Sequence, residues 1–221
     1  MKLLVSGLTK FICGILGVGL LVFLPAGTLE FKSGWLFMAV LFVPILIMGI
    51  ALFLKAPELL KKRLNSKERE NTQKGVVAFS GIVFLLGFIL AGLDFRFSWS
   101  FVPKWLVITA VVLFLASYLI YAEVMRENAY LSRTIEVAEN QTVIDTGLYS
   151  VVRHPMYTAT ILMFLMIPLI LGSLISFIVF LGYPLIIAVR INNEEKVLTE
   201  QLKGYAEYKQ KVKYKIIPFV W

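Results

Sequence analysis

The feature that most constrains this chain is a series of long segments that contain almost no charged residues. These segments cover residues 11–25 with their flanks, 34–54, 75–93, 105–122, 155–171 and 174–189. A helix needs about 20 mainly apolar residues to cross a bilayer. The last two segments are shorter, and only Gly172 and Ser173 separate them. We therefore predict an all-α fold, a polytopic membrane bundle of about six helices whose last two form a C-terminal helical hairpin.

The distribution of Lys and Arg predicts how this bundle is oriented. Nineteen of the 22 Lys and Arg residues lie in the N-terminus, in 55–74, in 123–153 or in the tail from 190 onward. Cationic residues beside membrane helices favour the cytoplasmic side. We therefore expect a multi-pass protein of the cell membrane with both termini and the functional site in the cytoplasm. The first segment is expected to remain as a helix, because no typical signal-peptide cleavage site follows it.

Composition also narrows the classes of partner. The formal net charge is +8, but the cationic residues cluster beside the apolar segments, where they face anionic headgroups. Membrane lipids are therefore expected partners, and nucleic acid is not. With one cysteine, Cys13, and one histidine, no cluster has the spacing of a zinc site. We expect no bound metal.

A first polar cluster precedes the hairpin, in residues 145–157. It holds the only histidine, His154, followed by Pro155, a residue that suits the first turn of a helix. Arg153 and His154 are therefore predicted at a helix N-terminus, where backbone N–H groups favour an anion such as a ligand carboxylate. A histidine that only caps a helix is the plainer alternative.

A second polar cluster follows the hairpin. Arg190 and Glu194 are four residues apart and share one helical face, whereas Glu195 points about 100° away. Because a hairpin returns its ends to one side, we predict that both polar clusters line a single pocket at the headgroup level. The alternative is an ordinary solvated pair at helical spacing.

The remaining tail, residues 196–215, is rich in Lys and Glu and is predicted as an interfacial amphipathic helix. We expect the chain to divide into an N-terminal four-helix membrane region, 1–125, and a C-terminal region, 126–221, that carries the chemistry. The expected apolar side of the tail helix consists of Val197, Leu198, Leu202, Tyr205, Tyr208 and Val212.

Together these residues resemble the isoprenylcysteine carboxyl methyltransferase family. The resemblance rests on the sequence from Gly147 to Tyr157, on the hairpin, on Arg190-x3-Glu-Glu195, and on a Tyr-x2-Tyr helix ending near Ile217-Pro218. It covers about residues 134–221, and membrane phospholipid N-methyltransferases and thiol methyltransferases share the same plan. One departure is Ala159, where the family usually has glycine.

The resemblance implies transfer of a methyl group from S-adenosyl-L-methionine to a lipophilic or lipid-anchored acceptor. It implies that Glu194 closes the cofactor site and that Arg190 binds the acceptor; Glu194 or Glu195 would serve as a base where the acceptor has a proton to lose. The implied cofactor-binding residues are Gln141, Thr142, Val143, Ile144, Tyr149, Arg153, His154, Pro155, Met156, Tyr157 and Glu194.

Two other functions fit parts of the pattern. Sterol and steroid reductases carry a similar Arg-His-Pro-x-Tyr and use NADPH, but they lack the Arg-x3-Glu-Glu step. A non-enzymatic scaffold or small-solute carrier would need neither cluster. The acceptor itself stays open among a prenylated carboxylate, a phospholipid amine, a thiol and a quinol.

Overall fold

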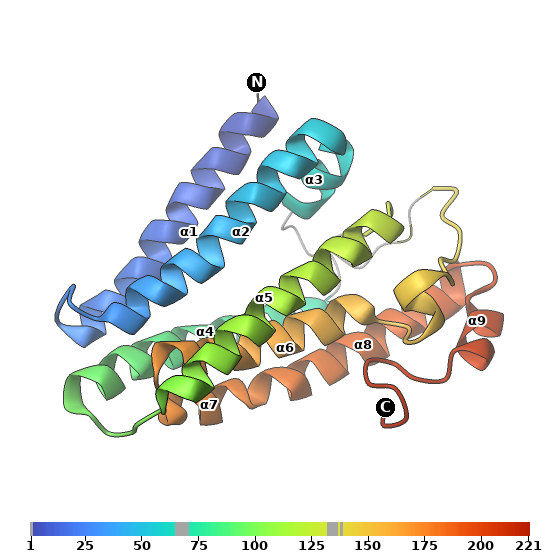
Figure 1. Cartoon of the computed structure of the whole chain (residues 1–221). Coiled ribbons are helices and arrows are strands. Elements are labelled where there is room, and N and C mark those ends of the chain that lie inside the picture. The colour runs from blue at the N-terminus through green and yellow to red at the C-terminus, as the bar shows by residue number, and fades with distance from the viewer. Residues whose placement is uncertain (1, 65–70, 132–136, 138) are drawn as a thin grey trace.

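The computed structural model describes residues 2–64, 71–131, 137 and 139–221, and every regular element in this part of the chain is helical (Figure 1). The predicted all-α class is confirmed. The elements in chain order are α1 (Lys2–Ala26), α2 (Lys32–Lys55), α3 (Pro57–Leu64), α4 (Asn71–Phe97), α5 (Lys104–Glu127), the 3₁₀ turn η1 (Gly147–Ser150), α6 (Pro155–Leu171), α7 (Leu174–Phe180), α8 (Gly182–Gln201) and α9 (Tyr205–Lys211).

Within the described residues, five helical stretches are long and apolar enough to cross a membrane: α1, α2, most of α4, α5, and α7 with α8 taken together. The apolar helix α6 is shorter, with 17 residues, and spans about 25 Å at 1.5 Å per residue. Only 6% of the residues in the apolar window of α1 are buried inside the protein, so much of this helix is left to face lipid. The chain is a multi-pass membrane protein.

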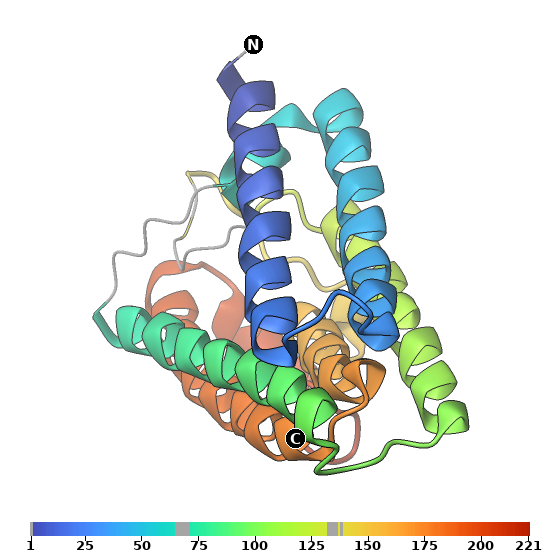
Figure 2. The ribbon, with the colours of Figure 1, turned by 90° about the vertical axis from the view of Figure 1, so that its left-hand side faces the viewer.

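The helices run alternately up and down, which brings the chain's polar segments to one end. The N-terminus, α3 and α9 lie at the top and right of Figure 1, whereas the turns α1–α2, α4–α5 and α6–α7 lie at the left and lower left. Figure 2 shows α1 and α2 side by side, with α4 crossing near the C-terminal end of α1. The polar segments before α6 and after α8 therefore share one end of the bundle.

Small residues on α4 allow this crossing. A Cβ atom on Gly92 would lie 2.6 Å from the backbone oxygen of Val22, so glycine lets α1 and α4 approach each other closely. Aromatic rings fill the space on either side: Phe88 of α4 lies between Phe37 of α2 and Phe180 of α7 in the main core.

The predicted hairpin is present and has a defined turn. Gly172 adopts a left-handed conformation with φ of +84°, and the Ser173 side chain accepts a hydrogen bond from the Ser176 amide at 3.0 Å. The buried Asp94 carboxylate of α4 accepts a 2.5 Å hydrogen bond from the Ser173 hydroxyl and a 2.7 Å hydrogen bond from the Ser100 amide. The hairpin turn is therefore tied to the α4–α5 turn.

The predicted interfacial helix over 196–215 is wrong in its extent and in what its apolar side contacts. α8 continues to Gln201, and Gly204, with φ of +86°, then separates it from the short α9. Leu202, Tyr205 and Tyr208 are buried and pack against Val143 of the preceding loop. The left-handed glycine redirects the chain, so these side chains cover the protein's own loop instead of lipid.

Candidate functional site

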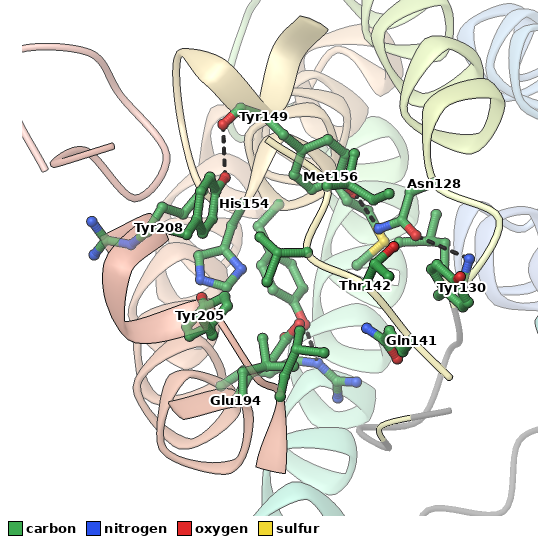
Figure 3. Close-up of a pocket in the computed structure, with 18 residues that line it drawn as sticks. Asn128, Tyr130, Gln141, Thr142, Tyr149, His154, Met156, Glu194, Tyr205 and Tyr208 are labelled. Carbon is green, nitrogen blue, oxygen red and sulfur yellow. Dashed lines mark hydrogen bonds between the residues drawn. The ribbon is translucent and has the colours of Figure 1, made fainter. Parts of the chain in front are cut away.

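The two polar clusters meet in one cavity, hereafter the polar cavity (Figure 3). It encloses about 840 Å³, including the solvent at its mouth. The predicted residues that line it are Gln141, Thr142, Val143, Ile144, Tyr149, Arg153, His154, Met156, Tyr157, Arg190 and Glu194. The hairpin thus brings together side chains from the loop before α6, the first turn of α6 and the end of α8.

A short hydrogen-bonded chain joins α6 to α8 in the wall of the cavity. The Tyr157 hydroxyl donates to Glu194 Oε2 at 2.5 Å and accepts from Arg190 Nε at 2.8 Å. Tyr157 is buried, so its hydroxyl is held between a cation and an anion in a fixed position. The spacing of Arg190 and Glu194 along α8 places both beside this one hydroxyl, as expected for one helical face.

Glu195 occupies a different environment and does not line the cavity. Its Oε1 atom accepts from Arg153 Nε at 2.6 Å and lies 3.3 Å from His154 Nε2, and all three side chains are buried. Lys209 Nζ and Lys215 Nζ lie 3.6 Å and 4.0 Å from its other oxygen. The anion at the N-terminus of α6 is therefore supplied by the chain's own carboxylate.

Pro155 also stays outside the cavity lining and forms the first residue of α6. The C-terminal tail holds the two residues that precede Pro155. The Arg153 and His154 amides donate hydrogen bonds to the backbone oxygens of Tyr214 and Lys215 at 2.9 and 2.8 Å. The Arg153 guanidinium donates to the backbone oxygen of Val212 at 2.7 Å. These contacts fix where the α6 N-terminus lies relative to α8.

The rim of the cavity is built on the turn η1. Gly147 has φ of +50°, and the Leu148 amide donates to the Glu127 carboxylate at the end of α5 at 3.1 Å. Tyr149, next in the turn, accepts a 2.9 Å hydrogen bond from Asn128 at its hydroxyl, and its backbone oxygen accepts from the Tyr208 hydroxyl at 2.7 Å. The turn is therefore held from both α5 and α9.

Sequence reasoning did not assign part of this lining. The additional residues are Asn128, Tyr130, Leu131, Leu198, Leu202, Tyr205 and Tyr208. The last four belong to the apolar side predicted for the tail helix. Their helical periodicity therefore indicates that they are buried, but the sequence analysis interpreted this burial as contact with lipid. The first three had no signal, because they follow α5 and reach the cavity only through tertiary packing.

One buried polar atom in this lining fits a polar ligand. The Tyr205 hydroxyl is buried and has no hydrogen-bond partner within the described part of the chain, and buried hydroxyls normally have one. Burial, reinforced by the nearby Glu195 and Glu194, raises the pKa of Tyr205 well above its ordinary value, and burial raises the pKa of Tyr149 to about 12. Both hydroxyls therefore keep their protons at physiological pH.

A second hollow, the apolar cleft, adjoins the polar cavity. It holds about 1,610 Å³, including open solvent, and most of its wall consists of apolar side chains of α4, α6 and α8, such as Val76, Phe84 and Ile187. Met156, Tyr157 and Arg190 line both hollows. The polar cavity and the apolar cleft therefore share a three-residue wall.

Fold and site together define a multi-pass membrane protein with a polar ligand cavity at one end of its helix bundle. The sequence model of the isoprenylcysteine carboxyl methyltransferase (ICMT) family matches residues 105–200, from α5 to the end of α8, so this part of the chain is similar to that family. The resemblance noted from the motifs is confirmed. No curated protein matches the sequence. The family domain and the membrane helices together support an integral membrane methyltransferase.

Proposed function

We propose that the protein transfers a methyl group from S-adenosyl-L-methionine to a lipophilic acceptor, with the cofactor in the polar cavity and the acceptor in the apolar cleft. The observation that carries the proposal is the shared wall of Met156, Tyr157 and Arg190. Transfer requires the two reactants about 3–3.5 Å apart with water excluded. Two hollows of opposite polarity separated by single side chains suit that requirement.

The polar cavity suits a ligand that carries charges of both signs. Glu194 offers an anion, Arg190 offers a cation, and the Tyr205 hydroxyl offers a buried donor and acceptor. Bound there, the cofactor would supply an electrophilic methyl group on a sulfonium. Gln141, Thr142, Val143 and Ile144 would hold it from the loop side and His154 from the first turn of α6.

On the acceptor side, Arg190 orients the reacting group. Arg190 donates through Nε to Tyr157 and lines both hollows, so its guanidinium can face an acceptor in the cleft. A carboxylate acceptor is already nucleophilic and needs this orientation alone. An amine or thiol must lose a proton, which Glu194 can accept, directly or through the Tyr157 hydroxyl that donates to it.

The roles of the two glutamates then differ. Glu194 belongs to the cavity and is proposed to close the cofactor site, whereas Glu195 is proposed to act as a positioning residue that holds Arg153 and His154. Of the three catalytic residues proposed from the sequence, Arg190 and Glu194 are thus proposed to contact the ligands. Glu195 is proposed to act only through Arg153 and His154.

Ligand binding to the purified protein in detergent tests the proposal. S-Adenosylhomocysteine is expected to raise the thermal unfolding midpoint in a concentration-dependent manner, because it binds only the folded state. NADPH, the cofactor of the alternative reductase function, is expected to give no shift. Labelled S-adenosyl-L-methionine incubated with the protein and a lipid extract would then place the label in an extractable lipid.

Glu194→Gln is expected to weaken S-adenosylhomocysteine binding by at least tenfold, about 1.4 kcal/mol. The matched control is Glu200→Gln, which makes the same change on an exposed position of the same helix, outside the cavity. Stabilisation by NADPH without stabilisation by S-adenosylhomocysteine would refute the proposal, as would equal affinity in both variants.

A further inference from the structure

A third hollow, hereafter the basic groove, lies between the ends of α2 and α5 and is bordered by α3. It holds about 1,180 Å³, including open solvent. Among the described residues, none that lines it also lines the polar cavity or the apolar cleft. α3 packs against α2, and Leu59 of α3 is buried in one cluster with Val124 and Met125 of α5. The groove is therefore built into the fold and is separate from the candidate site.

One half of the basic groove is apolar and belongs to helices that cross the membrane. α2 and α5 are both long and apolar enough to span a bilayer. Ala51 of α2 and Ala122 of α5 are small and exposed, so this half of the groove is open to the lipid beside the two helices. Its size and polarity suit an acyl chain. The apolar side chains that α2 and α5 contribute are Met48, Ala51, Leu52, Ala122 and Met125.

The other half of the basic groove carries charge and lies where the two apolar stretches end. Lys55, Lys62 and Arg126 line it, and Glu58 is the one carboxylate among the described residues of its lining. Glu58 Oε2 lies 3.8 Å from Lys61 Nζ, so this carboxylate already has a cation of its own beside it. The charged half therefore has an excess of positive charge at the level of the lipid headgroups.

Two of the three cations are available to a ligand. Arg126 donates to both carboxylate oxygens of Glu123, at 2.8 and 2.6 Å, and its charge is thereby matched. Lys62 Nζ donates to the backbone oxygen of Ala129 at 3.4 Å, and an ammonium group has three donors. Neither Lys62 nor Lys55 has a carboxylate partner within the described part of the chain. Both ammonium groups can therefore pair with an anion.

We propose that the basic groove binds an anionic phospholipid of the surrounding membrane, with an acyl chain along α2 and α5 and the headgroup phosphate at Lys55 and Lys62. Both halves select this ligand. A free phosphate leaves the apolar half unfilled, and a zwitterionic headgroup brings a cation of its own to the lysines. Basic pockets between membrane helices commonly bind anionic headgroups. The inference does not depend on the proposed methyl transfer, because the bound lipid is no reactant.

Lipid binding to the full chain in detergent tests this inference. Native mass spectrometry measures the dissociation constant of the first bound lipid for dioleoyl phosphatidylglycerol and dioleoyl phosphatidylcholine, which share their chains and differ in headgroup. The double variant Lys55→Gln/Lys62→Gln removes the two available charges. Its matched control, Lys196→Gln/Lys203→Gln, removes two charges from exposed positions outside the groove. Ala122→Trp fills the apolar half and keeps every charge.

The wild-type protein is expected to bind phosphatidylglycerol at least tenfold more tightly than phosphatidylcholine. Each lysine near an anionic headgroup contributes about fivefold in affinity. Lys55→Gln/Lys62→Gln is therefore expected to weaken phosphatidylglycerol binding at least tenfold and to leave phosphatidylcholine binding within twofold. The control pair keeps both affinities, and Ala122→Trp weakens both lipids at least fivefold. Phosphatidylglycerol is also expected to raise the thermal unfolding midpoint of the wild-type protein, because it binds the folded state.

Three results overturn the inference: a wild-type protein without a preference for phosphatidylglycerol, a Lys55→Gln/Lys62→Gln variant that keeps the preference, or an Ala122→Trp variant with unchanged affinities. Displacement of bound phosphatidylglycerol by millimolar glycerol 3-phosphate also overturns it, because the groove then binds a soluble phosphate. If the double lysine variant unfolds at a lower temperature than the control pair without lipid, Ala122→Trp decides the inference by its two affinities.

Discussion

At the scale of residues, Glu194 and Glu195 show how two adjacent identical side chains take different roles. A helix turns about 100° per residue, so Glu194 contacts the Tyr157 hydroxyl in the polar cavity while Glu195 contacts Arg153 and His154 behind it. Glu195 is buried, and a buried charge requires partners of opposite sign. Pairing with Arg153 and His154 therefore explains why a glutamate is buried at position 195, and no role at the reacting atoms is needed.

This difference predicts the effect of Glu195→Gln. Removing the charge leaves the buried Arg153 guanidinium uncompensated, so the free energy of unfolding is expected to fall by about 3 kcal/mol. Chemical or thermal unfolding in detergent measures this loss, with Glu200→Gln as the control that leaves stability unchanged. A full loss of methyl transfer at unchanged stability would instead assign Glu195 to the chemistry.

At the scale of elements, the site depends on the turn η1 and the tail that follows α8. The turn connects α5 to the cavity through the Glu127 carboxylate, and the tail connects α8 to the first turn of α6 through backbone oxygens of Tyr214 and Lys215. Each contact fixes one border of the cavity without lining it. The elements between the helices thus determine the shape of the site.

Gly147→Ala tests this dependence. Gly147 has a left-handed φ of +50°, which strains any other residue, and an added Cβ would clash with the Glu127 carboxylate, so that side chain or the turn must shift. We expect S-adenosylhomocysteine affinity to fall at least tenfold, as measured by thermal shift. Gly17→Ala is the control, because a Cβ there meets nothing within 4 Å in α1. Equal affinity in both variants would show that the turn does not shape the cavity.

The elements also show what the sequence could and could not predict. The hairpin was predictable because Gly172 and Ser173 leave no room for any other connection, and the hairpin alone unites the two polar clusters. The break at Gly204 was missed because helical periodicity continues across it. Asn128 was missed because its place at the site depends on how distant helices pack, which no local pattern records.

At the scale of the whole molecule, helix direction and charge both place the polar cavity on the side that holds the N-terminus and α3. Because the chain alternates direction, these segments and α9 lie at one end of the bundle (Figure 1). Among the described residues, nearly all Lys and Arg lie at that end, so we propose that it faces the cytoplasm.

Single-cysteine labelling tests the orientation. In a Cys13→Ala background, Ser150→Cys beside the cavity is expected to react with an impermeant maleimide only after the membrane is opened. Glu30→Cys, in the exposed turn between α1 and α2, is expected to react in intact cells. The reverse pattern would invert the topology and leave the cavity facing away from the cytoplasmic pool of cofactor.

The partition formed by Met156, Tyr157 and Arg190 has a consequence for the order of events in a catalytic cycle. If the polar cavity binds the cofactor and the apolar cleft binds the acceptor, as proposed, neither partner has to leave the phase in which it dissolves. Spent cofactor would then exchange with the cytosol while the next lipid is already bound. On this proposal, turnover needs no obligatory order of binding, and the supply of substrate from the bilayer is uncoupled from the renewal of the methyl donor.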